Sequence, residues 1–221
     1  MGLTVNTNIA SLDAISNLNG VQNMLTKSLS RISSGVRITR AGDDAAGLGV
    51  AENLSAANIS LRMAMRNTND GISVVQTAEG AASEIANILK RMRELAVQSA
   101  SETLANTERS YVNDEFVALG SEIDRIAEVT EFNGVPLANA AAAAVANLSV
   151  QVGIDGTANS QIDIDLFDLR STAANMAVDV GNIQLDTAAN AQAAIANIDT
   201  AIDFINSVRS GFGAAQNRLE A

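Results

Sequence analysis

The chain has 221 residues and a formal net charge of −11, with 47% hydrophobic and 18% charged residues. It is long enough for one or two domains with hydrophobic cores, and its negative charge disfavours nucleic acid as a partner. Cysteine and histidine are both absent, which excludes disulfides, thiol nucleophiles, histidine-based triads and the usual zinc sites.

The first predicted element is an amphipathic helix over residues 3–32. Its other faces carry uncharged Asn, Gln, Ser and Thr, where a solvent-exposed helix usually carries Lys and Glu. Neutral amides favour a surface that meets other protein, and the alternative is a weakly stable helix with a polar back. The apolar seam of this helix recurs every three or four positions, at Val5, Ile9, Leu12, Ile15, Leu18, Val21, Leu25, Leu29 and Ile32.

The stretch SSGVRITRAGDDAAGLG, Ser33 to Gly49, interrupts the helical pattern. A phosphate-binding loop would need a lysine after its last glycine and a preceding strand, and neither is found here. Asp43 and Asp44 could ligate a hard cation, but further oxygen ligands at loop spacing are missing. A joint between two helices fits better, because either aspartate can accept hydrogen bonds from the first N–H groups of the next helix.

Charge is distributed unevenly around this joint. Residues 1–42 hold four basic residues against one acidic residue, a net charge of +3, so the rest of the chain carries −14. Helical periodicity resumes over about 45–101, although Asn67–Ser73 (NTNDGIS) favours a turn locally. A single glycine inside a helix costs only about 1 kcal/mol relative to alanine, so the flanking apolar residues predict one unbroken helix.

Further helices are predicted at 106–129, with a heptad seam, and at 186–221. The segment EFNGVP after residue 129 ends its helix, with the glycine expected as the cap. Residues 147–166 alternate apolar and polar side chains around DGTANS, which predicts a β-hairpin with the Asp-Gly pair in its turn. The fold class is therefore mainly α: an elongated, antiparallel, coiled-coil-like helical rod with one β-hairpin.

Six blocks in order resemble the motifs of bacterial flagellin: NTNIASLDAISNL, SLSRISSGVRITRAGDDAAGLGVAENL, RNTNDGISVVQTAEGA, LKRMRELAVQSA, EIDRIAEVTEFNG and FGAAQNRLE. The resemblance implies a structural subunit of the flagellar filament, with residues 1–33 as the inner-core helix, 34–44 as the spoke and 45–221 as the outer-core rod. The large variable middle domains of that family are absent from this chain. The family also continues past QNRLE, so we expect a longer natural chain, and poor polymerisation of residues 1–221 alone.

The resemblance also implies where the protein works and what it meets. We expect a secreted protein of the extracellular filament, with other flagellin subunits, the flagellar export apparatus, a chaperone and the filament cap as partners. Neither nucleic acid nor a membrane is an expected partner, and the chain has no membrane-spanning apolar run. No cofactor is expected.

LKRMRELAVQ, Leu89 to Gln98, is similar to the segment through which many flagellins engage a vertebrate Toll-like receptor. The matching residues are Arg91, Leu95 and Glu115. Arg91 and Leu95 share a helix face, but Leu95 also borders the core stripe and is equally well explained as a packing residue.

Other classes of protein are alternatives to the filament subunit. A hook–filament junction protein shares the terminal helices, although the middle blocks favour flagellin. A peptidase would need an H-E-x-x-H helix, which a chain without histidine lacks. Asp163, Asp165 and Asp168 are typical of a solvated hairpin face rather than of paired catalytic carboxylates. A coiled-coil adaptor with no role in a polymer is the remaining alternative.

Overall fold

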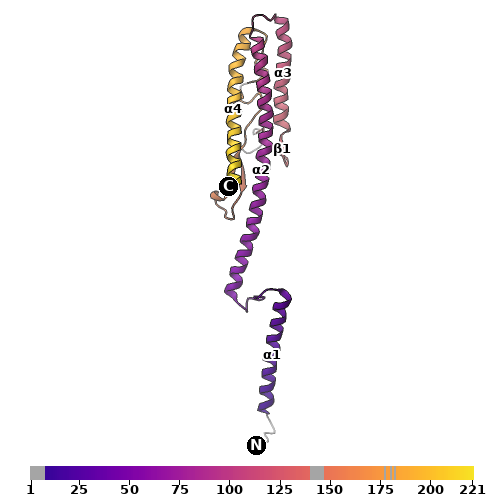
Figure 1. The fold of residues 1–221 in the computed structure, drawn as a ribbon, viewed down its shortest axis with the longest axis vertical. Helices are drawn as coiled ribbons and strands as arrows, with labels where there is room; N and C mark the ends of the chain where they lie inside the picture. The colour runs from indigo at the N-terminus through magenta and orange to yellow at the C-terminus, as the bar shows by residue number, and fades with distance from the viewer. Residues whose placement is uncertain (1–7, 140–146, 177, 180, 182) are drawn as a thin grey trace. The chain divides into compact units, whose positions relative to one another are not determined.

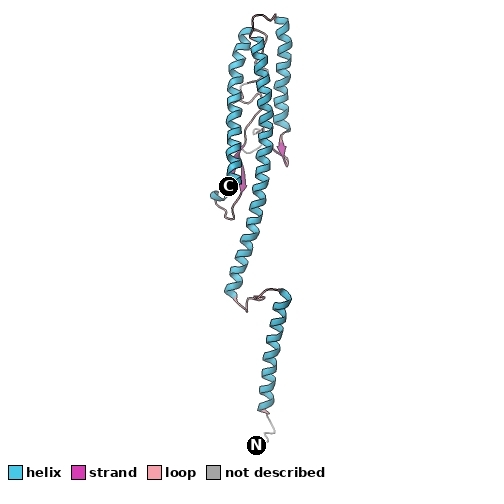
Figure 2. Ribbon diagram, viewed as in Figure 1, coloured by secondary structure: helices cyan, strands magenta, loops and turns pink. Residues whose placement is uncertain are grey.

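The computed structural model describes residues 8–139, 147–176, 178, 179, 181 and 183–221. The chain divides into two compact units, residues 1–59 and 60–221. The helices and strands appear in the order α1 (Ile9–Ser34), α2 (Ala45–Ser99), α3 (Asn106–Val129), β1 (Glu131–Phe132), β2 (Val135–Pro136), β3 (Asn147–Gln151), the 3-10 turn η1 (Ala158–Ser160), β4 (Gln161–Asp165) and α4 (Ala188–Glu220) (Figures 1 and 2). The predicted mainly α fold class is confirmed, and the described residues form two small antiparallel sheets where one hairpin was predicted.

In the first unit, α1 is defined at both ends by its caps. The Asn8 side chain accepts a hydrogen bond from the Ser11 N–H at 3.2 Å, which satisfies one of the free amides of the first turn. Gly35 follows the helix at φ 69° and returns its N–H to the Arg31 carbonyl. Glycine adopts this left-handed conformation without steric cost, so the helix stops there.

The core of the second unit lies where α2, α3 and α4 run side by side (Figure 1). The buried positions of α4 are spaced alternately three and four apart, which is the seam of a coiled coil. Large side chains such as Phe116, Ile123 and Leu89 are fully buried between the helices. The α4 seam consists of Ala191, Ala194, Ile198, Ala201, Ile205, Val208, Phe212, Ala215 and Leu219.

Helix α2 runs unbroken through Asn67–Ser73, as predicted against the local turn signal. Gly71 has a packing role in this stretch: a Cβ built on it would lie 3.2 Å from both Cγ atoms of Val150 on β3. The glycine therefore lets the hairpin approach the helix backbone closely. Gly80, also in α2, has no neighbouring atom within 4 Å of such a Cβ.

This difference predicts opposite effects for the same substitution at two sites of one helix. Gly80→Ala should raise the free energy of unfolding by about 0.5–1 kcal/mol, because alanine restricts the unfolded chain and fits the helix. Gly71→Ala should bring no such gain, since the new methyl group crowds Val150. Urea unfolding followed by circular dichroism measures both. An equal gain at the two positions would contradict the packing role of Gly71.

Two predictions about the turns were wrong. Gly134 does not cap α3, which ends at Thr130 in extended backbone. Instead Asn133 (φ 51°) and Gly134 (φ 78°) form the two-residue turn between β1 and β2, and both positive φ values are typical of the Asn-Gly hairpin turn. In the second hairpin the strands end at Gln151 and begin again at Gln161, so Asp155-Gly156 lies inside a longer loop rather than in a tight turn.

The β3–β4 hairpin closes the core between α2 and α4. Leu148 pairs with Ile164 and Val150 with Ile162, and these side chains face the helices. Beyond β4, the described residues within 166–187 form neither helix nor strand, and several of their side chains lie in the core. The buried residues of that segment are Leu166, Leu169, Ser171, Met176, Val178 and Leu185.

Candidate interaction surfaces

The apolar seam of α1 is exposed throughout. No residue of α1, all of which is described, is buried. Val5 was also predicted in this seam and lies outside the described residues. The large apolar side chains of α1 are between 53% and 79% exposed, and they include Ile9, Leu12, Ile15, Leu18, Val21, Met24, Leu25, Leu29 and Ile32. A continuous apolar stripe of this length marks a surface that binds other protein.

Asp44 lies immediately before the first residue of α2. Its Oδ1 accepts a hydrogen bond from the Gly47 N–H at 2.8 Å, the geometry of a helix N-cap. Gly47 permits this contact, since a Cβ at that position would collide with the Asp44 carboxylate.

Asp43 differs from its expected place at the helix start. It forms an ion pair with Lys27 of α1, and its Oδ2 accepts from the Thr39 hydroxyl at 3.1 Å. The Asp43 side chain is 10% exposed. Hydrogen bonding to Lys27 is the main reason that the pKa of Asp43 is lowered to about 2, with a smaller contribution from Thr39. Asp43 therefore ties the joint back onto α1, while Asp44 alone caps α2.

We expect a direct titration to find Asp43 with a pKa of about 2. A carboxylate with a lowered folded-state pKa stabilises the fold above its unfolded pKa and loses that contribution as the pH falls toward 2. Lys27→Gln should return the Asp43 pKa toward its ordinary value, because the main hydrogen-bond donor is gone. NMR of the carboxyl carbon reports both values. An Asp43 pKa near 4 in the parent chain would contradict the ion pair between Asp43 and Lys27.

The receptor motif is only partly on the surface. The Nε and Nη2 atoms of Arg91 both donate to Oε1 of Glu115, at 3.0 and 2.8 Å, and Nη1 donates to Glu94 at 3.0 Å. Glu115, followed by Glu94, raises the pKa of the Arg91 guanidinium. Leu95 is 1% exposed and packs in the core. This agrees with the alternative interpretation of Leu95 as a packing residue. Arg91 and Glu115 thus form an exposed pair to which Leu95 does not belong.

A buried arginine between α2 and α3 was missed from the sequence. Arg109 is 4% exposed, and it donates to the carbonyls of Ser99 at 2.6 Å and Ser101 at 2.8 Å. Within the described residues no carboxylate pairs with it. Helix α2 ends at Ser99, so the guanidinium satisfies free carbonyls at the negative end of that helix. Arg109 lies three residues before Val112 and so falls on the seam of α3. This spacing could have predicted its burial.

Neither a metal site nor a membrane span appears in the described part of the chain. Its acidic side chains do not gather in threes in a way that could hold a metal ion. Of the helices described, none combines the length and hydrophobicity needed to cross a bilayer.

The prominent features are an uncovered apolar helix and a three-helix core, and these define the class as a helical assembly protein.

Comparison with known proteins identifies the family. The family model for the bacterial flagellin N-terminal helical region matches residues 5–143. A flagellin of Halalkalibacterium halodurans is 41% identical over 99% of this chain, which spans 78% of that relative. The chain spans 45% of polar flagellin F of Vibrio parahaemolyticus, at 43% identity.

Solved structures of flagellar proteins also resemble this chain. The crystal structure of Bacillus cereus flagellin superposes with a TM-score of 0.60 and 34% identity, covering 71% of this chain and 85% of that one. A putative flagellar hook-associated protein from Vibrio parahaemolyticus shares the fold, with a TM-score of 0.64 at 16% identity, covering 82% of this chain and 91% of that one. The chain belongs to the bacterial flagellin family. Only residues 130–187 separate α3 from α4, so it is a short form without a large middle domain.

Proposed function

We propose that this flagellin is a structural subunit of the bacterial flagellar filament, and that it polymerises through the exposed seam of α1. The observation that carries the proposal is that every described side chain of that seam is exposed. Burying a side chain the size of Leu or Ile contributes about 1.5–3 kcal/mol. Nine such side chains supply enough free energy to offset the loss of subunit freedom on association.

The seam can be tested against a matched control on the same helix. The triple variant Ile15→Ser, Leu18→Ser and Leu25→Ser, mixed with parent flagellin, should be absent from the sedimented polymer. The control variant places three serines off the seam, at Asn17, Asn19 and Asn23. Serine keeps these faces polar and uncharged, so the control should sediment with the polymer as the parent does. Equal incorporation of the two variants would reject the seam as the assembly surface.

The same role accounts for the remaining properties proposed for the chain. The subunit leaves the cell through the flagellar export apparatus, with a chaperone, and adds beneath the filament cap. It acts outside the cell without catalysing a reaction. A hook–filament junction role is less well supported, because the relatives of substantial identity are named flagellins.

A second proposed function is recognition of the isolated subunit by a host Toll-like receptor, through Arg91 and Glu115. The exposure of these two side chains on adjacent helices supports it. Binding of the receptor ectodomain should weaken for Arg91→Ala and not for Arg93→Ala. Arg93 is a matched control, since it pairs with Asp199 on a different helix. Equal affinity for parent and both variants would reject this site, and failure of the parent to bind would reject the activity.

A further inference from the structure

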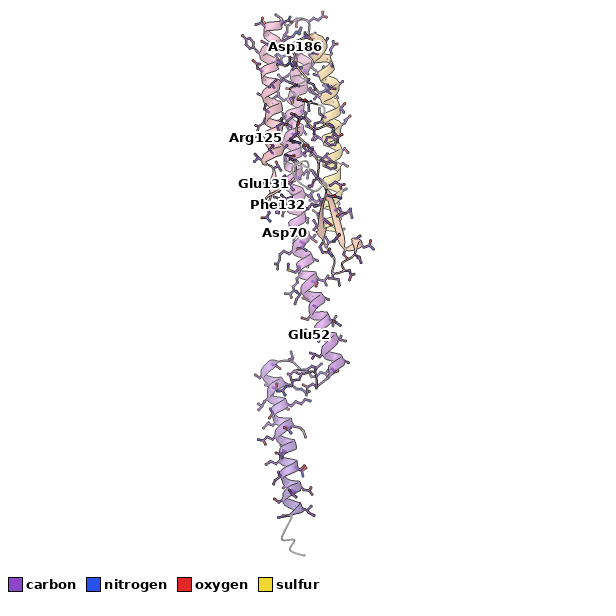
Figure 3. The ribbon with its side chains drawn as sticks, turned by 180° about the vertical axis from the view of Figure 1, so that it is seen from behind. Glu52, Asp70, Arg125, Glu131, Phe132 and Asp186 are labelled. Carbon is purple, nitrogen blue, oxygen red and sulfur yellow. The ribbon has the colours of Figure 1, made fainter. Side chains whose placement is uncertain are left out.

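An apolar groove with an acidic mouth lies in the second unit. Its volume is about 370 Å³, and it is bounded by α2, the β1–β2 hairpin and β3. Among the described residues that line it, only Asp70 is ionisable, and it is exposed beside Phe132 (Figure 3). The apolar lining consists of Val74, Phe132, Val135, Leu137, Leu148 and Val150. The groove therefore suits a segment that carries an apolar side chain next to a positive charge.

One rim of the groove is a strand edge that no other described strand covers. Within the described residues, β3 pairs with β4 alone. The Val152 N–H donates to the Ser160 carbonyl at 2.9 Å, and by the alternation of antiparallel pairing the backbone groups of Ser149 and Gln151 then point away from β4. The Gln151 carbonyl accordingly accepts from Asn67 of α2 at 3.1 Å. Apart from that carbonyl, an edge of this kind can accept another extended segment.

The segment Val36–Arg40 (VRITR) has the matching chemistry. It forms neither helix nor strand, Val36 is 53% exposed, and Arg37 and Arg40 are exposed. Within the described residues neither arginine has an ion-pair partner. The segment also belongs to the part of the chain with a net charge of +3, whereas the groove belongs to the part with −14. Opposite charges of this kind steer two copies into one orientation.

We propose that the groove binds the segment Val36–Arg40 of a second copy of this chain. Val36 enters the apolar groove beside β3, and Arg37 and Arg40 approach Asp70. Donor segment and acceptor groove are different surfaces, so the contact is head-to-tail and leaves one free donor and one free acceptor for further copies. The inference rests on the proposed assembly of the chain with its own copies, and it adds a contact separate from the α1 seam.

The 221 residues contain no cysteine, so engineered cysteines report this contact without background. One copy carries Val36→Cys and a second, size-tagged copy carries Ser149→Cys on the groove rim. Under mild oxidation the mixed disulfide should exceed, by about tenfold, that formed between Val36→Cys and Ser121→Cys, because a disulfide requires Cβ atoms about 4 Å apart. Ser121 is a control because it is also exposed but lies on α3.

Charge variants make the test specific. Asp70→Arg in the Ser149→Cys copy should lower the yield to the Ser121 level, and Arg37→Asp with Arg40→Asp in the other copy should restore it. Asp114→Arg on α3 should leave the yield unchanged. Equal yields at Ser149 and Ser121, or no response to Asp70→Arg, would overturn the proposal. Preferential cross-linking of Ser149→Cys to Ile15→Cys would assign the groove to α1 and also overturn it.

Sedimentation of the same samples separates this inference from the proposed function. Polymer that forms without the Val36–Ser149 cross-link would overturn the groove contact and leave the filament role intact. If the parent chain fails to co-assemble with flagellin at all, the filament role itself fails.

Discussion

Replacing Arg109 by methionine should lower the free energy of unfolding by about 3 kcal/mol. The substitution removes two hydrogen bonds from a charged donor, each contributing about 1.5–3 kcal/mol. It also leaves the carbonyls of Ser99 and Ser101 without their partner at the end of α2. Methionine retains much of the apolar stem, so the loss measures the guanidinium rather than a cavity.

Arg209→Met is the matched control. Arg209 lies on α4 and reaches Glu79 at 3.6 Å, with a side chain 37% exposed. Exposed ion pairs contribute about 0–1 kcal/mol, so this variant should unfold at nearly the parental urea concentration. Arg109→Lys should fall between parent and Arg109→Met, because an ammonium cannot span both carbonyls as the guanidinium does. A decrease of less than about 1 kcal/mol in the free energy of unfolding of Arg109→Met would contradict the stabilising role of the guanidinium at the end of α2.

In the isolated subunit, trypsin should cleave after Lys27 and Arg31 at least about 100-fold faster than after Arg109 or Arg93. Helix α1 buries none of its residues, and an isolated helix of its length is only marginally stable in water. Arg109, by contrast, lies within the three-helix core, so cleavage there requires that the core open.

Mass spectrometry of the early digest measures these rates. In urea above the unfolding midpoint the four sites should be cut at similar rates, which controls for local sequence preference. Cleavage at Lys27 as slow as at Arg109 under native conditions would show that α1 is stabilised without a partner.

Helices α2, α3 and α4 were predictable because each buries a periodic stripe. α3 begins and ends where the heptad pattern placed it, and α2 continues through Asn69-Asp70-Gly71 because apolar residues on both sides outweigh a local turn preference. The sequence also predicts that α1 is a surface that meets other protein, since its amide-rich faces differ from those of a solvated helix.

Other features depend on contacts that sequence spacing does not report. Lys27 engages Asp43 only because the chain reverses at Gly35, so two adjacent aspartates acquire different partners. The segment 166–187 has no regular period, yet its apolar residues fill the core between helices. Leu95 could not be placed inside or outside by spacing alone, because it borders the core stripe of α2.

Hydrogen exchange of α1 before and after assembly tests the central claim most directly. In the isolated subunit the amides of Ile9–Gln22, which precede the Lys27–Asp43 ion pair, should exchange almost as fast as those of an unstructured peptide, whereas those of Ile85–Ala96 stay protected. In polymer co-assembled with a longer flagellin the protection of Ile9–Gln22 should rise at least about 100-fold. Unchanged exchange of α1 in polymer would contradict assembly through its seam.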